Sequence, residues 1–428
     1  MFKVLVIAYY FPPMGLSGVQ RTLKFVKYMN EFNWEPTVVT SSNVAYFAHD
    51  ESLLAEAENA HIKIVRTSGK DINSKLAKRG TVRIPPEFIR KTLSRISNTI
   101  FIPDNKKGWA KKALLIAEEL LKKEEFNLIF VTAPPFSSIS MAIKLKNEFS
   151  LPLVVDYRDL WYGNQFAFYP TPIHRYLHKR MEYAAHRAAD KIIVTNRKMK
   201  EKILKRYKFL TFEDIYIISH GYDPEDFKDL SAEPKLNNKL WITYAGLFYE
   251  FITPKYFLKA FKKLYIEHPE VADNIELHFL GFLRNENKKL VKKLGLQKFV
   301  KEFGYLNHKE ALSKIITSDV LWMMVGHGRN ADTISSGKLY EYFGTRKPII
   351  ANLPEGALRL AAKDYGASFV TEPYDIDEIK NTILKVYELY VAKQLPKPNE
   401  NFVEKHKRDL LTGLLTKQFQ FLIKEDIK

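Results

Sequence analysis

The feature of this sequence that most limits its fold is the alternation of short apolar runs with stretches of helical periodicity. In the first half, apolar runs predict strands at 2–8, 36–41, 61–66, 127–132, 152–156, 190–195 and 214–218. Between them, apolar residues at helical spacing predict helices at 18–32, 109–124, 137–149, 171–189 and 197–207. Strands and helices that alternate in this way are typical of a parallel α/β architecture.

The alternation restarts after a polar stretch at 230–239, which contains one proline and two asparagines and is predicted to be a linker. Further strands are predicted at 240–245, 276–280, 299–303, 320–324, 348–351 and 368–370. Further helices are predicted at 254–267, 284–294, 308–317, 337–344, 355–363 and 375–391. We therefore predict two α/β domains, 1–229 and 240–400, and one basic amphipathic helix within 401–428.

Composition excludes several classes of site. The chain has 428 residues, enough for two domains, and it contains no cysteine, so disulfides, thiolate metal sites and a cysteine nucleophile need no consideration. No apolar run approaches the roughly 20 residues of a membrane span. The run after Met1 is too short for a signal peptide. We expect a cytoplasmic protein, either free or peripheral at the inner face of the membrane.

Positive charge is concentrated in one part of the chain. The formal net charge is +18, and twelve cations against three anions between Lys70 and Lys112 give an excess of +9 there. Within this part, Pro86–Phe101 has apolar residues at helical spacing, with Arg90, Lys91 and Arg95 among them. Such a helix is suited to an anionic membrane surface. The alternative is a helix packed on the N-terminal domain with its cations in solvent.

A second informative segment lies at 334–344, where a loop of small residues opens a short helix that ends at a glycine. Lys338 falls in the first helical turn, where a cation opposes the helix dipole. This placement is favourable when an anion binds the free N–H groups of the helix start. Glu341 lies on the same face and could accept hydrogen bonds from sugar hydroxyls. The alternative is an ordinary surface helix with a solvated Lys–Glu pair.

The first predicted strand leads into a turn that contains Gly15, Ser17 and Gly18. Glycines between a strand and the following helix allow the backbone to approach a ligand closely. The turn is neither a GxGxxG nor a Walker motif.

Three segments, Tyr10–Arg21, Asp156–Trp161 and Gly337–Tyr342, together resemble the family 4 glycosyltransferases of the GT-B fold. The resemblance implies two Rossmann-like domains that face a central cleft. It further implies an N-terminal acceptor domain and a C-terminal domain that binds a nucleotide-diphosphate sugar. In this fold the terminal helix packs back on the N-terminal domain.

The resemblance also implies roles for single residues. Lys338 and the N–H groups near Ser336 and Gly337 would neutralise the leaving diphosphate, and Glu341 would bind the ribose. Thr333 stands where many members have a glutamate. The turn at Gly246 lacks the cations found there in many members; Arg329 is either a replacement for a missing cation or a solvated loop residue. The predicted donor-binding residues are Gly246, Arg329, Thr333, Ser336, Gly337, Lys338, Leu339 and Glu341, and Gly15, Ser17 and Gly18 are predicted on the acceptor side.

Asp156, Arg158 and Asp159 follow a predicted buried strand and are the candidate catalytic residues. Carboxylates beside an arginine could orient an acceptor hydroxyl or take its proton. The alternative is a structural Arg–Asp bridge that locks the loop. Histidine spacing and the lack of a DxD motif predict no metal site.

The expected activity is transfer of a sugar to a cell-surface polysaccharide, a glycan or a lipid-pyrophosphate acceptor. We expect it to be retaining and metal-independent, with a UDP- or GDP-sugar as co-substrate and no other cofactor. A DNA-modifying glucosyltransferase would also explain the basic surface, although the sequence contains no recognised DNA-binding module and nucleic acid is the less favoured partner. A third possibility is a nucleotide-sugar-binding protein without turnover.

Overall fold

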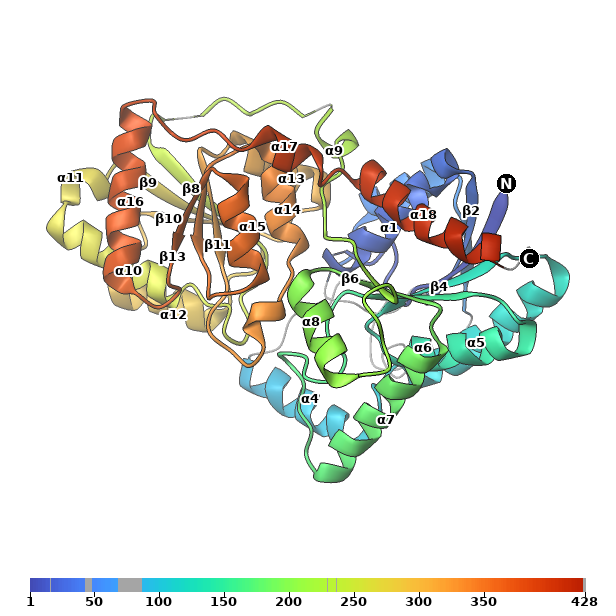
Figure 1. Cartoon of the computed structure of the whole chain (residues 1–428). Coiled ribbons are helices and arrows are strands. Elements are labelled where there is room, and N and C mark those ends of the chain that lie inside the picture. Colours follow the sequence, from blue (N-terminus) through green and yellow to red (C-terminus); the bar gives the residue numbers. More distant parts are fainter. Residues whose placement is uncertain (16, 43–47, 68–86, 229, 236, 426–428) are drawn as a thin grey trace. The chain divides into compact units, whose positions relative to one another are not determined.

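The computed structural model describes residues 1–428 except 16, 43–47, 68–86, 229, 236 and 426–428 (Figure 1). The chain forms two compact units. The first comprises Met1–His220 and Arg408–Lys428, and the second comprises Gly221–Lys407. Each unit is built on one parallel sheet covered by helices, so the prediction of a two-domain parallel α/β fold is confirmed.

The first unit has a seven-stranded sheet in the order β3-β2-β1-β4-β5-β6-β7. Its central strands are long apolar runs because helices cover both faces, and every residue of β4 is buried. On β1, Val6 pairs with Val38 on one side and Phe130 on the other. The strands are β1 (Phe2–Ile7), β2 (Trp34–Thr40), β3 (Lys63–Arg66), β4 (Leu128–Ala133), β5 (Leu153–Tyr157), β6 (Lys191–Val194) and β7 (Ile215–Ile217).

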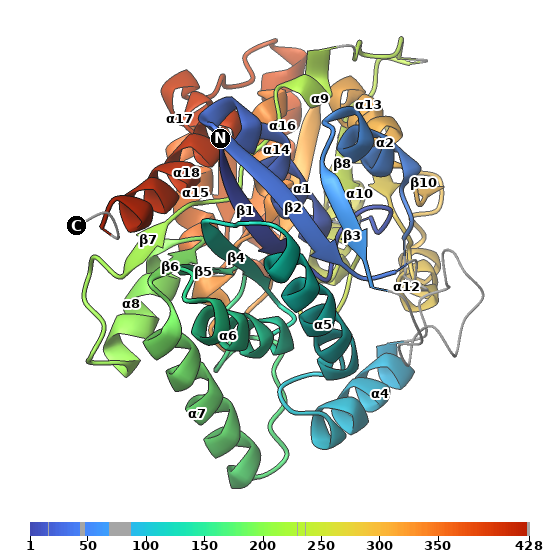
Figure 2. The ribbon, with the colours of Figure 1, turned by 90° about the vertical axis from the view of Figure 1, so that its right-hand side faces the viewer.

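Helices cover this sheet, and Figure 2 shows α5 and α6 on the face turned toward the viewer. The helix α2 was not predicted from the sequence. The helices of the first unit are α1 (Ser17–Met29), the 3-10 helix η1 (Asn30–Phe32), α2 (Glu51–Asn59), α4 (Glu87–Ile100), α5 (Lys107–Lys123), α6 (Ser137–Phe149), α7 (Pro172–Ala188), α8 (Arg197–Arg206) and α18 (Arg408–Glu425).

The helix α18 belongs to the first unit by its packing. Leu411, Leu415 and Phe419 recur every four residues and form a buried stripe along one side of the helix. The ring of Phe419 lies 5.2 Å from that of Trp34 and 5.5 Å from that of Phe130, measured between centroids. The last helix of the chain therefore closes the core formed by the first strands.

The prediction of one continuous C-terminal helix is wrong. The structure has two helices there, α17 (Glu400–Glu404) and α18, separated by a turn. In this turn the carbonyl of His406 accepts a hydrogen bond from the N–H of Tyr222, at 3.0 Å, and Lys407 forms a bridge with the same residue. These backbone groups are used between segments, so they cannot also continue a helix.

The second unit has a six-stranded sheet in the order β10-β9-β8-β11-β12-β13. Its strands are β8 (Leu240–Ala245), β9 (Ile275–Leu280), β10 (Val300–Gly304), β11 (Val320–Met324), β12 (Ile349–Asn352) and β13 (Ser368–Thr371). Its helices are α9 (Glu225–Lys228), α10 (Lys255–Glu267), α11 (Pro269–Ala272), α12 (Asn285–Leu294), α13 (His308–Thr317), η2 (Ala331–Thr333), α14 (Gly337–Thr345), α15 (Ala357–Tyr365), α16 (Ile376–Val391) and α17.

Alternating side chains of β11 explain how this sheet is covered on both faces. Trp322 packs in a cluster with residues of α10 and α16, whereas Leu321 and Met323 pack in a second cluster with residues of α14 and α15. Successive strand residues point to opposite faces, so an unbroken apolar strand requires two apolar layers. Figure 1 shows these two helix layers on either side of the sheet.

The second unit begins at Gly221, before the expected boundary at residue 229. The ring of Tyr222 packs so closely on Gly344 that a Cβ added there would lie 2.6 Å from it. In the expected linker, the N–H of Glu233 donates to Thr317 Oγ1 at 2.9 Å, and Lys235 pairs with Asp319 at 2.6 Å. The polar composition of 230–239 therefore reflects surface hydrogen bonding to the second unit.

Candidate functional site

The second unit has a switch point at the centre of its sheet. Strands β8 and β11 are neighbours, and the chain continues from β8 to one side and from β11 to the other. In open α/β sheets, ligands bind outside the carboxyl ends of the strands at such a point. The turn at Gly246 follows β8, and the loop that leads to α14 follows β11.

Gly246 makes the close approach of Lys338 possible. It has φ +130°, which favours glycine, and a Cβ there would lie 2.5 Å from the Lys338 Nζ. A second glycine turn follows β9, where a Cβ on Gly281 would lie 2.5 Å from the carbonyl oxygen of Gly246. The lysine ammonium therefore lies against backbone at the carboxyl end of β8.

Lys338 is half-buried, with its Nζ 3.9 Å from the ring centroid of Tyr244. Burial lowers the pKa of Lys338 to about 7, although the charge of Glu341 acts in the opposite direction. Ser336 precedes α14 in an extended conformation, and its side chain makes no capping hydrogen bond within the described chain. A desolvated amine beside an uncapped helix start, which begins with the buried Gly337, favours a bound anion.

Glu341 is held by a histidine that the sequence did not indicate. Its Oε1 lies 2.8 Å from Nε2 of His308, and the two side chains are 18% and 12% exposed. His308 is the first residue of α13, which is capped by Asn307 and Glu310 in a reciprocal capping box. A carboxylate fixed in this way is well placed to accept hydrogen bonds from hydroxyl groups. No local motif could reveal the pair, because 33 residues separate its members.

The helix α14 is anchored to the sheet by side chains on its other face. Leu339 is fully buried among apolar residues. The hydroxyl of Tyr342 accepts the N–H of Ala245 at 2.8 Å, and burial raises the pKa of Tyr342. Leu339, predicted among the donor-binding residues, is therefore placed in the core, where it orients the helix that carries Lys338.

The loop before α14 holds the remaining two predicted donor-binding residues. Thr333 is buried and its hydroxyl donates to the carbonyl of Asn330 at 2.8 Å. Arg329 is exposed on the same loop. The structure thus turns Thr333 toward its own backbone and leaves Arg329 in solvent.

In the first unit, Asp156 is fully buried at the end of β5 and pairs with Arg21 of α1. Two hydrogen bonds of 2.8 and 3.0 Å join the guanidinium to the two carboxylate oxygens. Arg21 also donates to the carbonyls of Ile218 and Ser219. This closed network favours the structural alternative for Asp156, with Arg21 as its partner in place of the adjacent arginine.

Arg158 joins the first glycine turn to the turn after β4. Its guanidinium donates to the carbonyls of Gly18 and Pro134. A Cβ on Gly18 would lie 3.1 Å from Nη1 of Arg158. The N–H of Gly15 donates to Ala48 at 2.9 Å, and Ser17 is the first residue of α1. The turn that contains Gly15, Ser17 and Gly18 is therefore held through its backbone groups, which bond to the carbonyl of Ala48 and to the guanidinium of Arg158.

Asp159, the second predicted catalytic carboxylate, lies outside the ion pair of Asp156 with Arg21. It lies two residues beyond β5 and is partly exposed. Desolvation of its carboxylate raises the pKa of Asp159. The Gln165 amide, which donates a hydrogen bond at 3.3 Å, and the charge of Arg158 oppose this shift. A raised pKa is typical of carboxylates that exchange protons.

The predicted amphipathic segment forms the helix α4, and its apolar side chains are exposed to solvent. Phe88 is 80% exposed, Leu93 57% and Ile100 65%. Figure 2 shows α4 below α5 on the outside of the first unit. Residues 68–86, with Pro86 and five of the twelve cations, lie outside the described residues. Among the described helices, none is long and apolar enough to cross a membrane.

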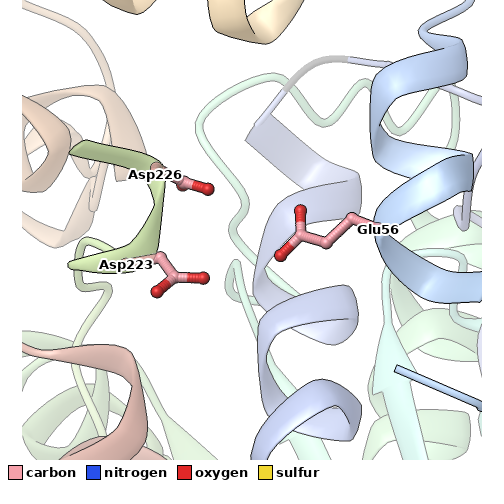
Figure 3. Close-up of side chains that lie close together, drawn as sticks. All are labelled: Glu56, Asp223 and Asp226. Carbon is pink, nitrogen blue, oxygen red and sulfur yellow. The ribbon is translucent and has the colours of Figure 1, made fainter. Parts of the chain in front are cut away.

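Each unit has acidic side chains of the kind that bind metal ions, and partners within the unit engage them. Figure 3 shows Glu56 on α2 of the first unit, and Asp223 and Asp226 at α9 of the second. Glu56 is paired with Lys24 and Lys27 at 2.6 and 2.9 Å, and Asp223 accepts the N–H of Glu225 at 3.0 Å. Glu56 and Asp223 are therefore each engaged by groups of their own unit.

Comparison with known proteins bears on both units. Residues 18–226 match the family model Glycosyltransferase Family 4. The comparison with curated sequences found no match.

Solved structures resemble the whole chain at low sequence identity. A glycosyltransferase from Rickettsia africae has a TM-score of 0.65 at 15% identity, with 99% of each chain covered. Sucrose-phosphate synthase from Thermosynechococcus elongatus has a TM-score of 0.66 at 14% identity, covering 99% of this chain and 100% of that one. Anabaena HepE in complex with UDP and glucose has a TM-score of 0.65 at 13% identity, covering 98% and 100%.

Proposed function

Because residues 18–226 match the Glycosyltransferase Family 4 model and the whole chain has the fold of solved GT-B glycosyltransferases, we propose that its second unit binds a nucleotide-diphosphate sugar and that the enzyme transfers the sugar to a glycan or lipid-linked acceptor. The observation that carries the proposal is the Lys338 amine, which lies against Gly246 at the start of α14. This arrangement offers positive charge and helix N–H groups at one place.

Each part of the donor has a candidate partner. Lys338 and the first N–H groups of α14 neutralise the diphosphate, whose negative charge grows as the glycosidic bond breaks. Glu341, oriented by His308, accepts hydrogen bonds from the ribose hydroxyls. We favour a uridine nucleotide, and the crystal structure of Anabaena HepE with UDP and glucose supports this choice. With the Lys338 amine as the counter-charge of the diphosphate, we propose transfer without a metal ion, and the family resemblance implies retention of the anomeric configuration.

For the acceptor, we favour a lipid-linked glycan reached at an anionic membrane surface. The exposed apolar residues of α4 and its cations Arg90, Lys91 and Arg95 support this choice. Burial of apolar side chains at the lipid boundary, together with attraction to anionic head groups, is the physical basis of binding by such helices.

Donor binding is tested by thermal-shift titration of the full chain with UDP, GDP, ADP and their sugars. A ligand that binds only the folded state raises the melting temperature by mass action. We expect a shift with UDP that Lys338→Met and Glu341→Gln each reduce strongly. The matched controls are Lys385→Met and Glu388→Gln on α16, both exposed, which should keep the full shift.

Activity is tested by UDP release from UDP-sugars with a set of glycan and lipid-linked acceptors, and the anomeric configuration of the product is read by NMR. Nucleotide binding without release or transfer would indicate a binding protein without turnover. Failure to bind any nucleotide, with salt-sensitive binding to DNA instead, would favour the DNA-modifying alternative.

Membrane binding is tested by co-sedimentation with vesicles that contain phosphatidylglycerol. We expect Phe88→Ser combined with Leu93→Ser to weaken binding, because both side chains are exposed and their loss should leave the fold intact. Leu115→Ser, at a residue of α5 that is 65% exposed, is the control. Equal binding by all variants would overturn the role of α4.

A further inference from the structure

The first unit has a pocket that none of the roles above explains. It lies where the loop after β5 meets α7 and α8, and its volume is about 540 Å³, within the usual range for small-ligand sites. Four aromatic side chains line it: Tyr162, Tyr183, Tyr207 and Phe209. Both α7 and α8 belong to the first unit, so the pocket is complete within that unit.

The aromatic rings form a pre-arranged wall. Tyr183 is 48% exposed, and its ring packs edge-on against Phe209, with centroids 4.9 Å apart at 70°. On another side, Tyr162 stacks on Tyr169 at 5.2 Å. Exposed aromatic faces held by other rings cost little entropy on binding and suit flat, partly apolar ligands such as the C–H face of a sugar ring.

Buried hydrogen bonds keep this wall rigid. Glu182 is 1% exposed and accepts the N–H of Tyr162 at 3.0 Å and the hydroxyl of Tyr207. Arg206 pairs with the same carboxylate at 3.0 Å and donates to the Tyr162 carbonyl at 2.7 Å. The charge of Arg206 is therefore balanced by Glu182, which is buried behind the pocket wall.

Two further cations in the pocket are not balanced. Lys179 lies with its Nζ 5.0 Å from the ring centroid of Tyr162, and Lys208 is exposed at the rim. Neither lysine pairs with a carboxylate among the residues that the structure describes. The pocket thus combines aromatic walls with excess positive charge, a combination that selects an anionic ligand over a neutral one.

We propose that this pocket binds a sugar residue that carries a phosphate or a carboxylate, with the ring against Tyr183 and the anionic group at Lys179 and Lys208. As a site for part of the acceptor, whether a free glycan or a glycolipid head group, it rests on the proposed transferase function. Recognition of an anionic sugar by the pocket itself does not depend on that function.

Binding is measured by saturation-transfer NMR on the full chain, with glucose 6-phosphate, glucuronate and glucose as probes. Saturating UDP is added to fill the anion site at Lys338. If UDP does not bind, the same measurement is made on Lys338→Met, in which that site has lost its charge. We expect both anionic probes to bind more tightly than glucose. Lys179→Gln with Lys208→Gln should weaken the anionic probes about tenfold, the size expected for two exposed ion pairs, and leave glucose unchanged.

The control is Lys111→Gln with Lys144→Gln, two exposed helix lysines of the same unit, which removes the same total charge. Tyr183→Ala should weaken all three probes. Vesicles with and without phosphatidylinositol separate a head group from a free sugar as the source of the ligand. An equal effect of the two lysine pairs, or no preference for anionic probes, would overturn the proposal. UDP binding measured on the same variants reports separately on the donor site.

Discussion

At the scale of single residues, Lys338 combines two opposed demands. Desolvation favours its neutral amine, whereas a diphosphate ligand favours its ammonium. Gly246 admits the side chain to this position only because it has no Cβ. The binding free energy of the nucleotide is therefore linked to a proton.

This linkage predicts how affinity varies with pH. Burial lowers the pKa of Lys338 to about 7 in the free protein, and a bound diphosphate should raise it. Between these two pKa values binding takes up a proton, so UDP affinity should fall as the pH rises above 7, by at most about tenfold per unit. Calorimetry in buffers of different ionisation enthalpy measures the uptake. Lys338→Arg stays charged and should lose this dependence; an unchanged dependence would contradict the assignment.

The two aspartates near the end of β5 should respond differently to substitution. Asp156→Asn leaves the buried Arg21 without its charged partner, which should cost about 3–5 kcal/mol of unfolding free energy in urea titrations. Asp159→Asn should leave stability and UDP binding nearly unchanged.

If Asp159 is the general base, Asp159→Asn should reduce transfer about 10²–10⁴-fold. Because burial raises the pKa of Asp159, the wild-type rate should fall as the pH drops through that raised value, where the carboxylate becomes protonated. A variant with full transfer activity and an unchanged pH profile would exclude this role.

At the scale of elements, α18 illustrates how a distant segment completes a core. Phe419 is fully buried, whereas Phe421 on the same helix is 51% exposed. Phe419→Ala should therefore cost about 3–5 kcal/mol of unfolding free energy, and Phe421→Ala should cost much less. Thermal and urea unfolding of the two variants measure the difference. Similar losses would mean that α18 does not pack as described.

The local pattern predicts helices well where they are long and periodic, as with α10 and α16. The pattern does not reveal α9 and α11, because each has four residues and contributes about one turn to any periodicity. The break between α17 and α18 was missed for a different reason. The backbone bond from Tyr222 to His406 joins segments far apart in the sequence, so no local signal marks it.

At the scale of the whole molecule, each unit has its own core, and the candidate donor site lies in the second. UDP at a hundredfold excess over its Kd should therefore stabilise that unit by about 2.7 kcal/mol. Hydrogen exchange followed by mass spectrometry should show slower exchange in β8 and α14 than in the ligand-free protein. Amides of β4 in the first unit should change less; equal protection of both would contradict a donor site within the second unit.

The sequence is sufficient to predict the parallel α/β class and the two-domain plan, because the periodicities of buried strands and amphipathic helices are local. It also indicated Gly246, Lys338 and Glu341, because helix starts and glycine turns have local signatures. The partners of these residues are set by the packing of segments that are distant in the sequence. His308 reaches Glu341 across 33 residues and Arg21 reaches Asp156 across 135, since sheet order sets which carboxyl ends and helix starts meet.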